Sequence, residues 1–332
     1  MSSIGDIILT TPLIRVVRKR FPDASITFLV KSQFYDVIKT NPHINHIISF
    51  DKKSGLQGLR KLRQDIVKEN YDLLLDIHKS LRSRYLRWFS GVQTIGSYSK
   101  QIFNRTLLVN FGINLYKEQK PVYERYFEAV SDYGLVYDGA GTEVVVPESE
   151  ADIIIKSLVD DGYRYTQPLV ALCPAASFTN KRWFEARYAE LADYLIKKYD
   201  TTICLLGSKS DYEICERIKE QLGNKALNYA GKFSLLGSAA VLMFCKFAVT
   251  NDSGLMHLAQ SQKTPVVALF GPTTRELGYF PIPEKSRVVE AQVKCRPCTH
   301  NGLDYCPKKH FKCMSQIQVA DVIKAIEGLN VL

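Results

Sequence analysis

Short apolar runs alternate along this chain with segments whose apolar residues recur at helical spacing, and loops rich in Gly, Pro and polar residues separate them. A continuous apolar run of about four to eight residues is typical of a strand buried on both faces, as in a parallel sheet. Because the runs alternate with helical segments, the pattern predicts an α/β protein with parallel strands. The runs lie at 25–30, 46–50, 73–77, 169–173, 202–206, 226–229, 247–250, 266–270 and 287–290.

Amphipathic segments predict the helices that connect these strands. Thr11 followed by Pro12 is a favourable helix start, because proline fits the first helical turn. Leu56, Leu59 and Ile66 fall on one face of a later segment, as expected for a helix packed on a sheet. The predicted helices span 12–20, 56–68, 123–133, 149–158, 184–198, 211–222, 235–244 and 319–328, and a further helix begins at Ser253.

The length of 332 residues is too great for one ordinary hydrophobic core and fits two domains. We assign residues 1–150 to the N-terminal domain and 151–332 to the C-terminal domain, with a polar hinge at 160–168. Both halves show the same alternation, so we expect two Rossmann-like domains that face each other across a cleft. A hydrophobic content of 46% with 23% charged residues argues against wholesale disorder.

Charge is distributed unevenly along the chain. The net charge is +10, and residues 77–116 contain no Asp or Glu but carry Lys79, Arg82 and Arg105 among several aromatic residues. Such a surface suits an anionic membrane, an acidic glycolipid or a nucleic acid, and a solvated basic face is the simplest alternative. No apolar stretch is long enough to span a bilayer, and the first residues lack the order of a signal peptide, so we expect a cytoplasmic protein.

The run Thr-Asn-Asp-Ser-Gly-Leu-Met-His at 250–257 follows the strand predicted at 247–250 and opens a helix. Free backbone N–H groups and the positive end of the helix dipole would meet there, which favours a bound anion such as a phosphate. We expect Asp252, Ser253, Gly254 and His257 to lie at this site. The alternative is that Asp252 or Ser253 only caps the helix. Pro272 and Thr273 follow the next strand, at the same edge of a parallel sheet.

Four of the eight cysteines, Cys295, Cys298, Cys306 and Cys313, lie within a segment at 295–313. A reducing cytoplasm argues against lasting disulfides, and a CxxC pair with two further thiols could provide four tetrahedral ligands. The long gaps between the later cysteines are less typical of zinc than two CxxC pairs. A structural zinc site and free thiols therefore remain as two alternatives.

Several of these segments resemble the bacterial heptosyltransferases, a glycosyltransferase family that builds the inner core of lipopolysaccharide. The similarity covers Ser-Ser-Ile-Gly-Asp at 2–6, the segment 76–83, the segment 173–183 ending in Lys-Arg-Trp, the run 250–257 and Gly-Pro-Thr at 271–273. The Cys-Arg-Pro-Cys segment at 295–298 is similar to the subgroup that adds the second heptose. The resemblance implies the GT-B fold.

The resemblance also implies roles for particular residues. Asp6, after Gly5, would be the base that deprotonates the acceptor hydroxyl, although Ser3 and Asp6 also have the spacing of a helix capping box. Lys181 would contact the donor diphosphate. The alternative interpretation is that Lys181 is an ordinary surface lysine. Further donor-binding residues would be Ser177, Gly207, Ser208, Asp252, Ser253, Gly254, His257, Pro272 and Thr273.

The acceptor is expected to bind in the N-terminal half, at Gly5, Lys79, Arg82 and Arg105. Arg82 would hold a carboxylate or phosphate of the acceptor by charge-assisted hydrogen bonds. His78 and Lys79 depart from the Gln and Gly of the family's pattern, which puts the identity of the acceptor in question. Family members usually carry an apolar strand before the motif at 2–6, so we expect an upstream segment that supplies it.

These observations lead to one function and its alternatives. We expect an inverting transferase that moves heptose from ADP-heptose to the inner core of lipopolysaccharide, without a metal in its chemistry and resting on the inner membrane surface. Nucleic acid is not an expected partner. The alternatives are a transferase of another nucleotide-activated sugar to a surface glycan, or a non-catalytic protein that binds a nucleotide sugar or a nucleic acid.

Overall fold

The computed structural model describes residues 3–332, and the chain divides into two compact units. One unit contains the chain up to Ile102 together with Lys120–Val145, and the other contains Phe103–Gln119 together with Val146–Leu332. This division differs from the predicted boundary after residue 150. It also assigns the segment Phe103–Gln119, with Arg105, to the unit that holds the C-terminal half. Among the described residues, no helix is long and apolar enough to cross a membrane.

The second unit is built on a six-stranded sheet in which every neighbouring pair of strands is parallel. The strand order is β10-β9-β8-β5-β6-β7. Read from β7, with β5 counted as the first strand of the unit, this is the order 3-2-1-4-5-6 of the Rossmann fold. The predicted strands are confirmed to within one or two residues. They are β5 (Leu169–Cys173), β6 (Thr202–Leu205), β7 (Ala226–Asn228), β8 (Phe247–Asn251), β9 (Val266–Phe270) and β10 (Ser286–Glu290).

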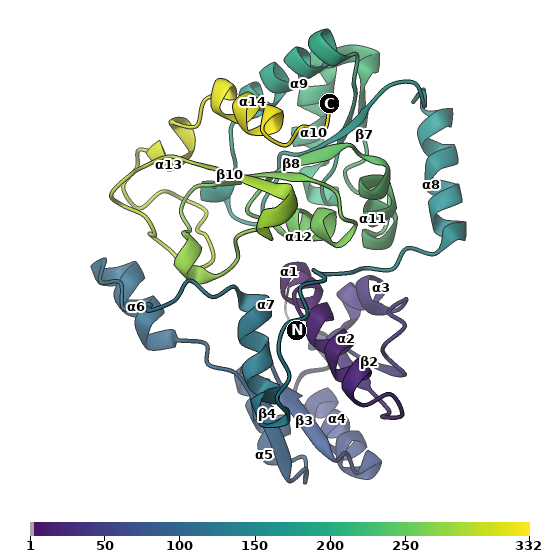
Figure 1. The fold of residues 1–332 in the computed structure, drawn as a ribbon, viewed down its shortest axis with the longest axis vertical. Helices are drawn as coiled ribbons and strands as arrows, with labels where there is room; N and C mark the ends of the chain where they lie inside the picture. The colour runs from purple at the N-terminus through teal and green to yellow at the C-terminus, as the bar shows by residue number, and fades with distance from the viewer. Residues whose placement is uncertain (1–2) are drawn as a thin grey trace. The chain divides into compact units, whose positions relative to one another are not determined.

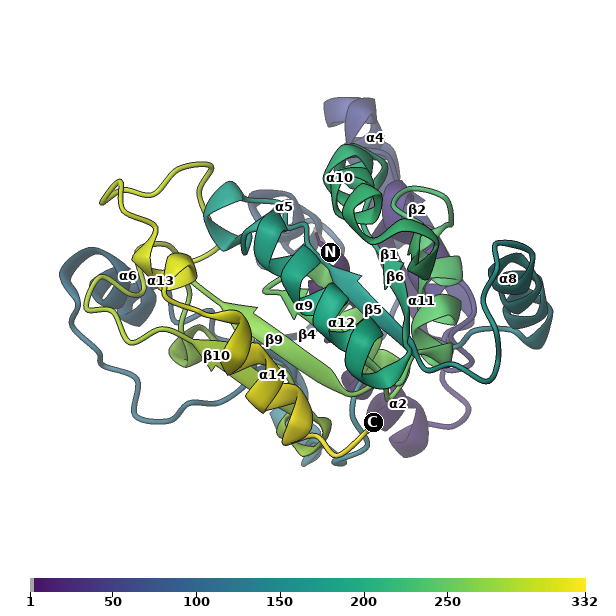
Figure 2. The same ribbon diagram turned by 90° about the horizontal axis from the view of Figure 1, so that it is seen from above.

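Helices cover both faces of this sheet. Figures 1 and 2 show α9 and α14 side by side over one face, where they contact each other, with α10 packed beside α9. The other face carries α11 and α12, and α8 packs on α11. The bounds are α8 (Glu148–Asp160), α9 (Glu185–Tyr199), α10 (Tyr212–Leu222), α11 (Leu235–Phe244), α12 (Gly254–Ser261), α13 (Lys312–Ser315) and α14 (Val319–Glu327).

The core of this unit lies between the sheet and the layer formed by α9, α10 and α14. Leu172, Val249 and Leu269 from three adjacent strands pack there with Leu191 of α9 and Val322 of α14, and all five are buried. Because strands buried on both faces need apolar side chains at nearly every position, these strands appear in the sequence as continuous apolar runs.

The first unit contains two separate pairs of parallel strands. Strand β1 (Thr27–Lys31) pairs with β2 (His46–Phe50), and β3 (Leu73–Asp76) pairs with β4 (Thr94–Ser97). Helix α4 (Gly55–Glu69) packs on α5 (Leu81–Trp88) through a small apolar cluster that includes Leu62 and Leu86. The other helices with α-helical geometry are α1 (Ile4–Ile8), α2 (Thr11–Arg20), α3 (Tyr35–Ile38) and α7 (Val122–Arg125).

Some elements differ from the predictions. The helix predicted at 123–133 is α7 followed by a 3-10 helix at Tyr126–Tyr133, with Val130 outside helical geometry. Helices α1, α3, α5, α6 (Ile102–Phe111) and α13 and strand β4 were not predicted. The expected upstream strand falls outside the described residues and stays a prediction.

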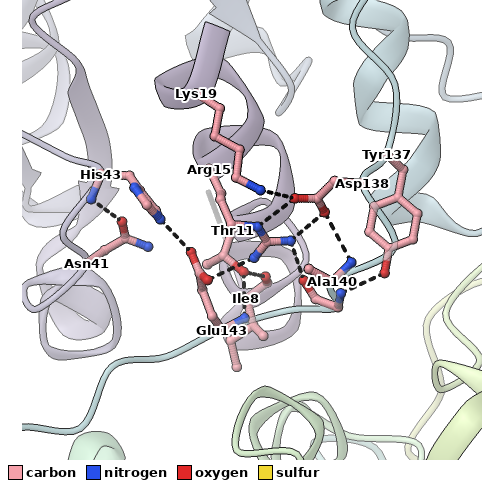
Figure 3. Close-up of polar contacts among 11 residues, drawn as sticks. Ile8, Thr11, Arg15, Lys19, Asn41, His43, Tyr137, Asp138, Ala140 and Glu143 are labelled. Carbon is pink, nitrogen blue, oxygen red and sulfur yellow. Dashed lines mark hydrogen bonds and ion pairs between the residues drawn. The ribbon is translucent and has the colours of Figure 1, made fainter. Parts of the chain in front are cut away.

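A buried arginine links the start of the first unit to its end (Figure 3). Arg15 of α2 donates from Nε and Nη2 to the two carboxylate oxygens of Asp138, at 2.9 and 2.8 Å, and from Nη1 to Glu143 Oε2 at 2.8 Å. Lys19 adds a contact of 3.0 Å to Asp138. The hydrogen bonds from Arg15 hold the pKa of Asp138 well below its usual range.

Replacing Arg15 with Met should lower the stability of the first unit by about 3 kcal/mol or more, because two partly buried carboxylates lose their cation. The depressed pKa of Asp138 means that this contribution is present at neutral pH and disappears as pH falls below about 4. The difference between the wild-type and variant melting temperatures should therefore be large at pH 7 and shrink in acid. Arg20→Met, at an exposed position of the same helix, is the matched control. Equal melting temperatures for all three proteins at pH 7 would contradict this account.

Candidate functional site

The loops that follow β5, β8 and β9 meet around a buried ion pair. Lys181 Nζ lies 2.6 Å from Asp252 Oδ2, and the two side chains are only 12% and 8% exposed. Thr273 donates its hydroxyl to the same carboxylate oxygen at 2.7 Å. The structure therefore brings together three residues that the sequence placed at the donor site. Lys181 is not the solvated surface lysine of the alternative interpretation.

Unpartnered polar atoms surround this ion pair. Ser253 stands at the N-cap position of α12, but its side chain makes no capping hydrogen bond. Within residues 3–332, the buried atoms Ser253 Oγ, His257 Nδ1 and Thr274 Oγ1 have no hydrogen-bond partner. Buried polar atoms are nearly always paired, so unpaired atoms grouped at a helix N-terminus indicate a ligand site. Simple capping by Ser253 or Asp252 is therefore not what the structure contains.

His257 is uncharged at this site. Burial, and to a smaller extent the neighbouring Lys181, lowers its pKa to about 4, although Asp252 opposes the shift. At neutral pH the imidazole can therefore offer a hydrogen bond to a ligand but no positive charge. Positive charge at this position comes from Lys181 and from the backbone N–H groups at the start of α12.

A buried asparagine that sequence reasoning missed fixes the loop carrying Lys181. Asn251, the last residue of β8, is fully buried and donates from Nδ2 to Pro174 O at 2.8 Å. Its Oδ1 accepts a hydrogen bond from Trp183 N at 3.1 Å, so both ends of the loop are tied to one side chain. Ser177 is exposed on this loop. The signal in the sequence was an amide directly after a strand, but it was not distinguished from a turn residue.

The other predicted donor residues lie at the same edge of the sheet. Gly207 and Ser208 follow β6, the neighbour of β5, and Ser208 forms a capping box with Asp211. A Cβ at Gly207 would lie 2.9 Å from Asp211 Cβ, so the turn admits no side chain. Pro272 follows β9, and its carbonyl accepts a hydrogen bond from Cys298 N at 3.1 Å.

In the first unit, Ser3 caps α1 through Asp6, which is one half of the capping box that the spacing predicted. Ser3 Oγ donates to Asp6 Oδ2 at 2.7 Å, and Asp6 N donates to Ser3 Oγ at 3.1 Å at the start of α1. Gly5 is buried beside it. The carboxylate remains an acceptor and is partly exposed, so the cap and a proton-accepting role are compatible at this position.

The loop after β3 explains the glycine of the family's pattern. Lys79 has a φ of 46°, a left-handed conformation that glycine adopts without penalty. Asp76 Oδ1 accepts hydrogen bonds from His78 N and Lys79 N, and Lys79 Nζ donates to Tyr98 O at 2.8 Å. The ammonium of Lys79 is therefore already used within the unit. Arg82 is exposed on the first turn of α5.

Several cations converge near these residues. Burial, Lys52 and Arg82 lower the pKa of Lys31, while Asp6 opposes the shift. Burial lowers the pKa of His78 to about 4, with contributions from Lys100 and Lys31. The region around the carboxyl ends of β1 and β3 is therefore electropositive, as expected for a site that receives an anionic ligand.

Arg105 does not belong to the first unit with these cations, and its predicted role in binding the acceptor stays a prediction. It lies on α6, in the segment that groups with the second unit. Asn114 of this segment donates to Glu276 Oε1 at 3.3 Å. Burial, Arg105 and Lys181 together lower the pKa of His300, so Arg105 acts electrostatically on the unit that contains Lys181.

The four cysteines of the segment 295–313 are free thiols that influence one another. Burial, Cys298 and Cys295 raise the pKa of Cys313 to about 11. Burial alone would raise the pKa of Cys306, but backbone N–H groups from Lys308 to Phe311 lower it below its usual value. Among the residues that the structure describes, no three His, Cys, Asp or Glu side chains are arranged to hold a metal ion.

Comparison with known proteins gives one consistent result. The model of glycosyltransferase family 9 (heptosyltransferase) matches residues 59–308. Lipopolysaccharide heptosyltransferase 2 of Escherichia coli is 28% identical over 87% of this chain and 85% of its own length. The solved structure of a family 9 glycosyl transferase from Veillonella parvula has a TM-score of 0.81 and 28% identity, covering 98% of this chain and 94% of its own. The solved structure of the E. coli ADP-heptose heptosyltransferase II has a TM-score of 0.77 and 25% identity, covering 99% and 96%.

Replacing Ser253 with Ala should leave the melting temperature of the ligand-free protein almost unchanged, because the hydroxyl has no partner within the described chain. The stabilisation that saturating ADP gives the wild type should become smaller. Thr264→Val is the control, since Thr264 Oγ1 donates to Leu242 O at 2.7 Å. This control should lower the melting temperature and keep the full shift with ADP. Thermal scans with and without ADP separate the two effects, and an unchanged ADP shift for Ser253→Ala would remove that hydroxyl from the site.

Proposed function

Because the chain belongs to glycosyltransferase family 9, the heptosyltransferases, we propose that it transfers heptose from ADP-heptose to an acceptor in the inner core of lipopolysaccharide. The observation that carries this proposal is the buried pair of Lys181 and Asp252 beside the unpaired Ser253 and His257, at the N-terminus of α12. A diphosphate supplies the acceptor oxygens that these groups lack. Family membership identifies an enzyme and argues against the non-catalytic alternatives.

The donor would bind to the second unit. Lys181 and the N-terminus of α12 would neutralise the diphosphate, while the neutral His257 and Ser253 would donate hydrogen bonds. Asp252 keeps the ammonium of Lys181 in place through its 2.6 Å contact. These cations and dipoles would stabilise the charge that develops on the leaving ADP, so the proposed mechanism assigns no step to a metal ion.

The acceptor would bind to the first unit. Asp6 would take the proton of the attacking hydroxyl, and attack on the side of the sugar opposite ADP would invert the anomeric centre. Arg82, with Lys31 and Lys100 nearby, would bind an acidic group of the acceptor. His78 and Lys79 distinguish this acceptor region from the family's usual pattern, so a screen of nucleotide-activated sugars and acceptors would define the true substrates.

Replacing Asp6 with Asn should lower the rate of heptose transfer about 100-fold or more and leave ADP binding unchanged, because an amide cannot accept the proton. The amide oxygen can still accept from Ser3 Oγ, so the cap at α1 should persist and the melting temperature should stay near that of the wild type. Transfer is measured as heptosylated product formed from ADP-heptose and a truncated core acceptor. A rate within a few-fold of the wild type would reduce Asp6 to a helix cap, and wild-type hydrolysis of ADP-heptose without transfer would reject the acceptor assignment.

We also propose that the enzyme works at the surface of the inner membrane, with α6 as a contact. Phe103 and Phe111 on α6 are each 69% exposed, in a part of the chain that lacks acidic residues. Exposed aromatic side chains beside basic residues suit the interface of an anionic bilayer. Helix α5 of the first unit has the same combination of an exposed aromatic and a basic residue, because Trp88 is 67% exposed and follows Arg87.

Changing both Phe103 and Phe111 to Ser should weaken binding to vesicles that contain anionic phospholipid, with little effect on the melting temperature. Binding is measured by vesicle flotation at low and high salt, and salt should reduce it because the basic residues contribute. Tyr165→Ser, at a 70% exposed aromatic elsewhere in the second unit, is the matched control. Equal flotation of the double variant and the wild type would exclude α6 as the contact.

Zinc at Cys295, Cys298, Cys306 and Cys313 remains a proposal, supported by the lowered pKa of Cys306 and by the mutual influence of the thiols. The side chains would have to move closer together to bind it. One equivalent of zinc per chain should copurify when purification avoids chelators, and its removal should lower the melting temperature. Elemental analysis without zinc would leave the free-thiol alternative.

A further inference from the structure

The segment 295–313 contacts two of the three loops that carry the proposed donor site, and the first is the loop after β5. Asn180, next to Lys181, donates from its backbone N to Leu303 O at 3.0 Å. Its side-chain Oδ1 accepts a hydrogen bond from Leu303 N at 2.9 Å. A Cβ at Gly302 would lie 2.4 Å from the ring of Phe178, so the Phe178 side chain packs directly on the Gly302 backbone and leaves no room for a side chain there.

A second set of contacts reaches the loop after β9. Arg296 donates from Nη2 to Thr273 O at 2.8 Å and from Nη1 to Ala291 O at 2.9 Å, and its side chain is only 6% exposed. Glu290, the last residue of β10, pairs with the same guanidinium at 2.5 Å. Arg296 therefore fixes the backbone of Thr273 to the end of the neighbouring strand.

These contacts form a continuous path to the ion pair. Arg296 holds Thr273 by its carbonyl, and Thr273 donates its hydroxyl to Asp252, which pairs with Lys181. Asn180, the residue next to Lys181, is held by its two hydrogen bonds with Leu303. An ammonium on a flexible side chain binds a diphosphate well only if its position is fixed before the ligand arrives.

We propose that Asn180 and Arg296 are positioning residues, through which the segment 295–313 sets the affinity of the site for the diphosphate of the donor. This inference rests on the proposed function, because it takes the ion pair of Lys181 and Asp252 as the diphosphate site. The segment thereby acts on substrate binding as well as on the stability of the unit. Neither residue contacts the donor itself in this scheme.

The test measures ADP binding by calorimetry for Asn180→Ala and Arg296→Gln, together with the Michaelis constants for donor and acceptor. Both variants should bind ADP about 10-fold more weakly than the wild type and raise the Michaelis constant for the donor by a similar factor. The Michaelis constant for the acceptor should stay unchanged. Arg296→Lys keeps the positive charge but loses the planar guanidinium, so its affinity for ADP should lie between those of the wild type and Arg296→Gln.

Arg287→Gln is the matched control. Arg287 also starts from β10 and donates to two carbonyls, Ser286 O and Gly328 O, but it is exposed and has no contact with the donor loops among the described residues. Melting temperatures of all variants separate stability from affinity. A lowered melting temperature with ADP affinity within two-fold of the wild type, for both Asn180→Ala and Arg296→Gln, would reduce the segment to a structural support.

Lys181→Ala distinguishes the failure of this inference from that of the proposed function. If the wild type binds ADP and Lys181→Ala does not, the donor site is correctly placed, and normal affinity in the Asn180 and Arg296 variants would overturn the inference alone. If Lys181→Ala binds ADP as well as the wild type does, the site is misplaced, and both proposals fail. Weak binding in all three variants, with Arg287→Gln unchanged, is the expected result.

Discussion

The reversal of strand order between β5 and β8 is the constraint on which the second unit and its proposed donor site depend. Chain connections leave these two neighbouring strands in opposite directions, so their following loops diverge at the carboxyl edge of the sheet, where sheets of this topology bind ligands. Asn251 lies at this edge and forms hydrogen bonds with both ends of the loop after β5. The loop with Lys181 and the start of α12 therefore face one another because of topology, and a buried amide makes that arrangement rigid.

The pair of Lys181 and Asp252 places a carboxylate close to a proposed diphosphate, which requires an explanation. An ammonium as buried as this one would be costly without a partner, and Asp252 with the hydroxyl of Thr273 supplies the compensation. The carboxylate is then neutralised locally, and the α12 N-terminus adds positive potential. The arrangement keeps a cation desolvated and fixed at the site, at the cost of one opposing charge.

The sequence predicted the second unit closely and the first unit less well, for a physical reason. Strands such as β5 and β9 are buried on both faces, so their apolar runs have no competing interpretation. Strand β4 is short and has no buried residue, and the three arginines of α5 obscured its helical character. The apolar residues of α6 do not gather on one face, so its sequence lacked the pattern of a packed helix. The three-dimensional contact of Lys181 with Asp252 follows from topology, whereas Asn251 and Arg296 were missed because a single polar residue carries no pattern.

The loop after β3, in the proposed acceptor region, shows how a departure from a family pattern can be partly compensated. A lysine in the left-handed conformation of Lys79 costs roughly 1–2 kcal/mol relative to glycine. The hydrogen bond from its ammonium to Tyr98 O, together with the Asp76 bonds to the loop, offsets part of this cost. Because the ammonium is used in this way, the proposed acceptor site relies on Arg82 and on the cations around His78, and the lysine at 79 acts mainly on the stability of the loop.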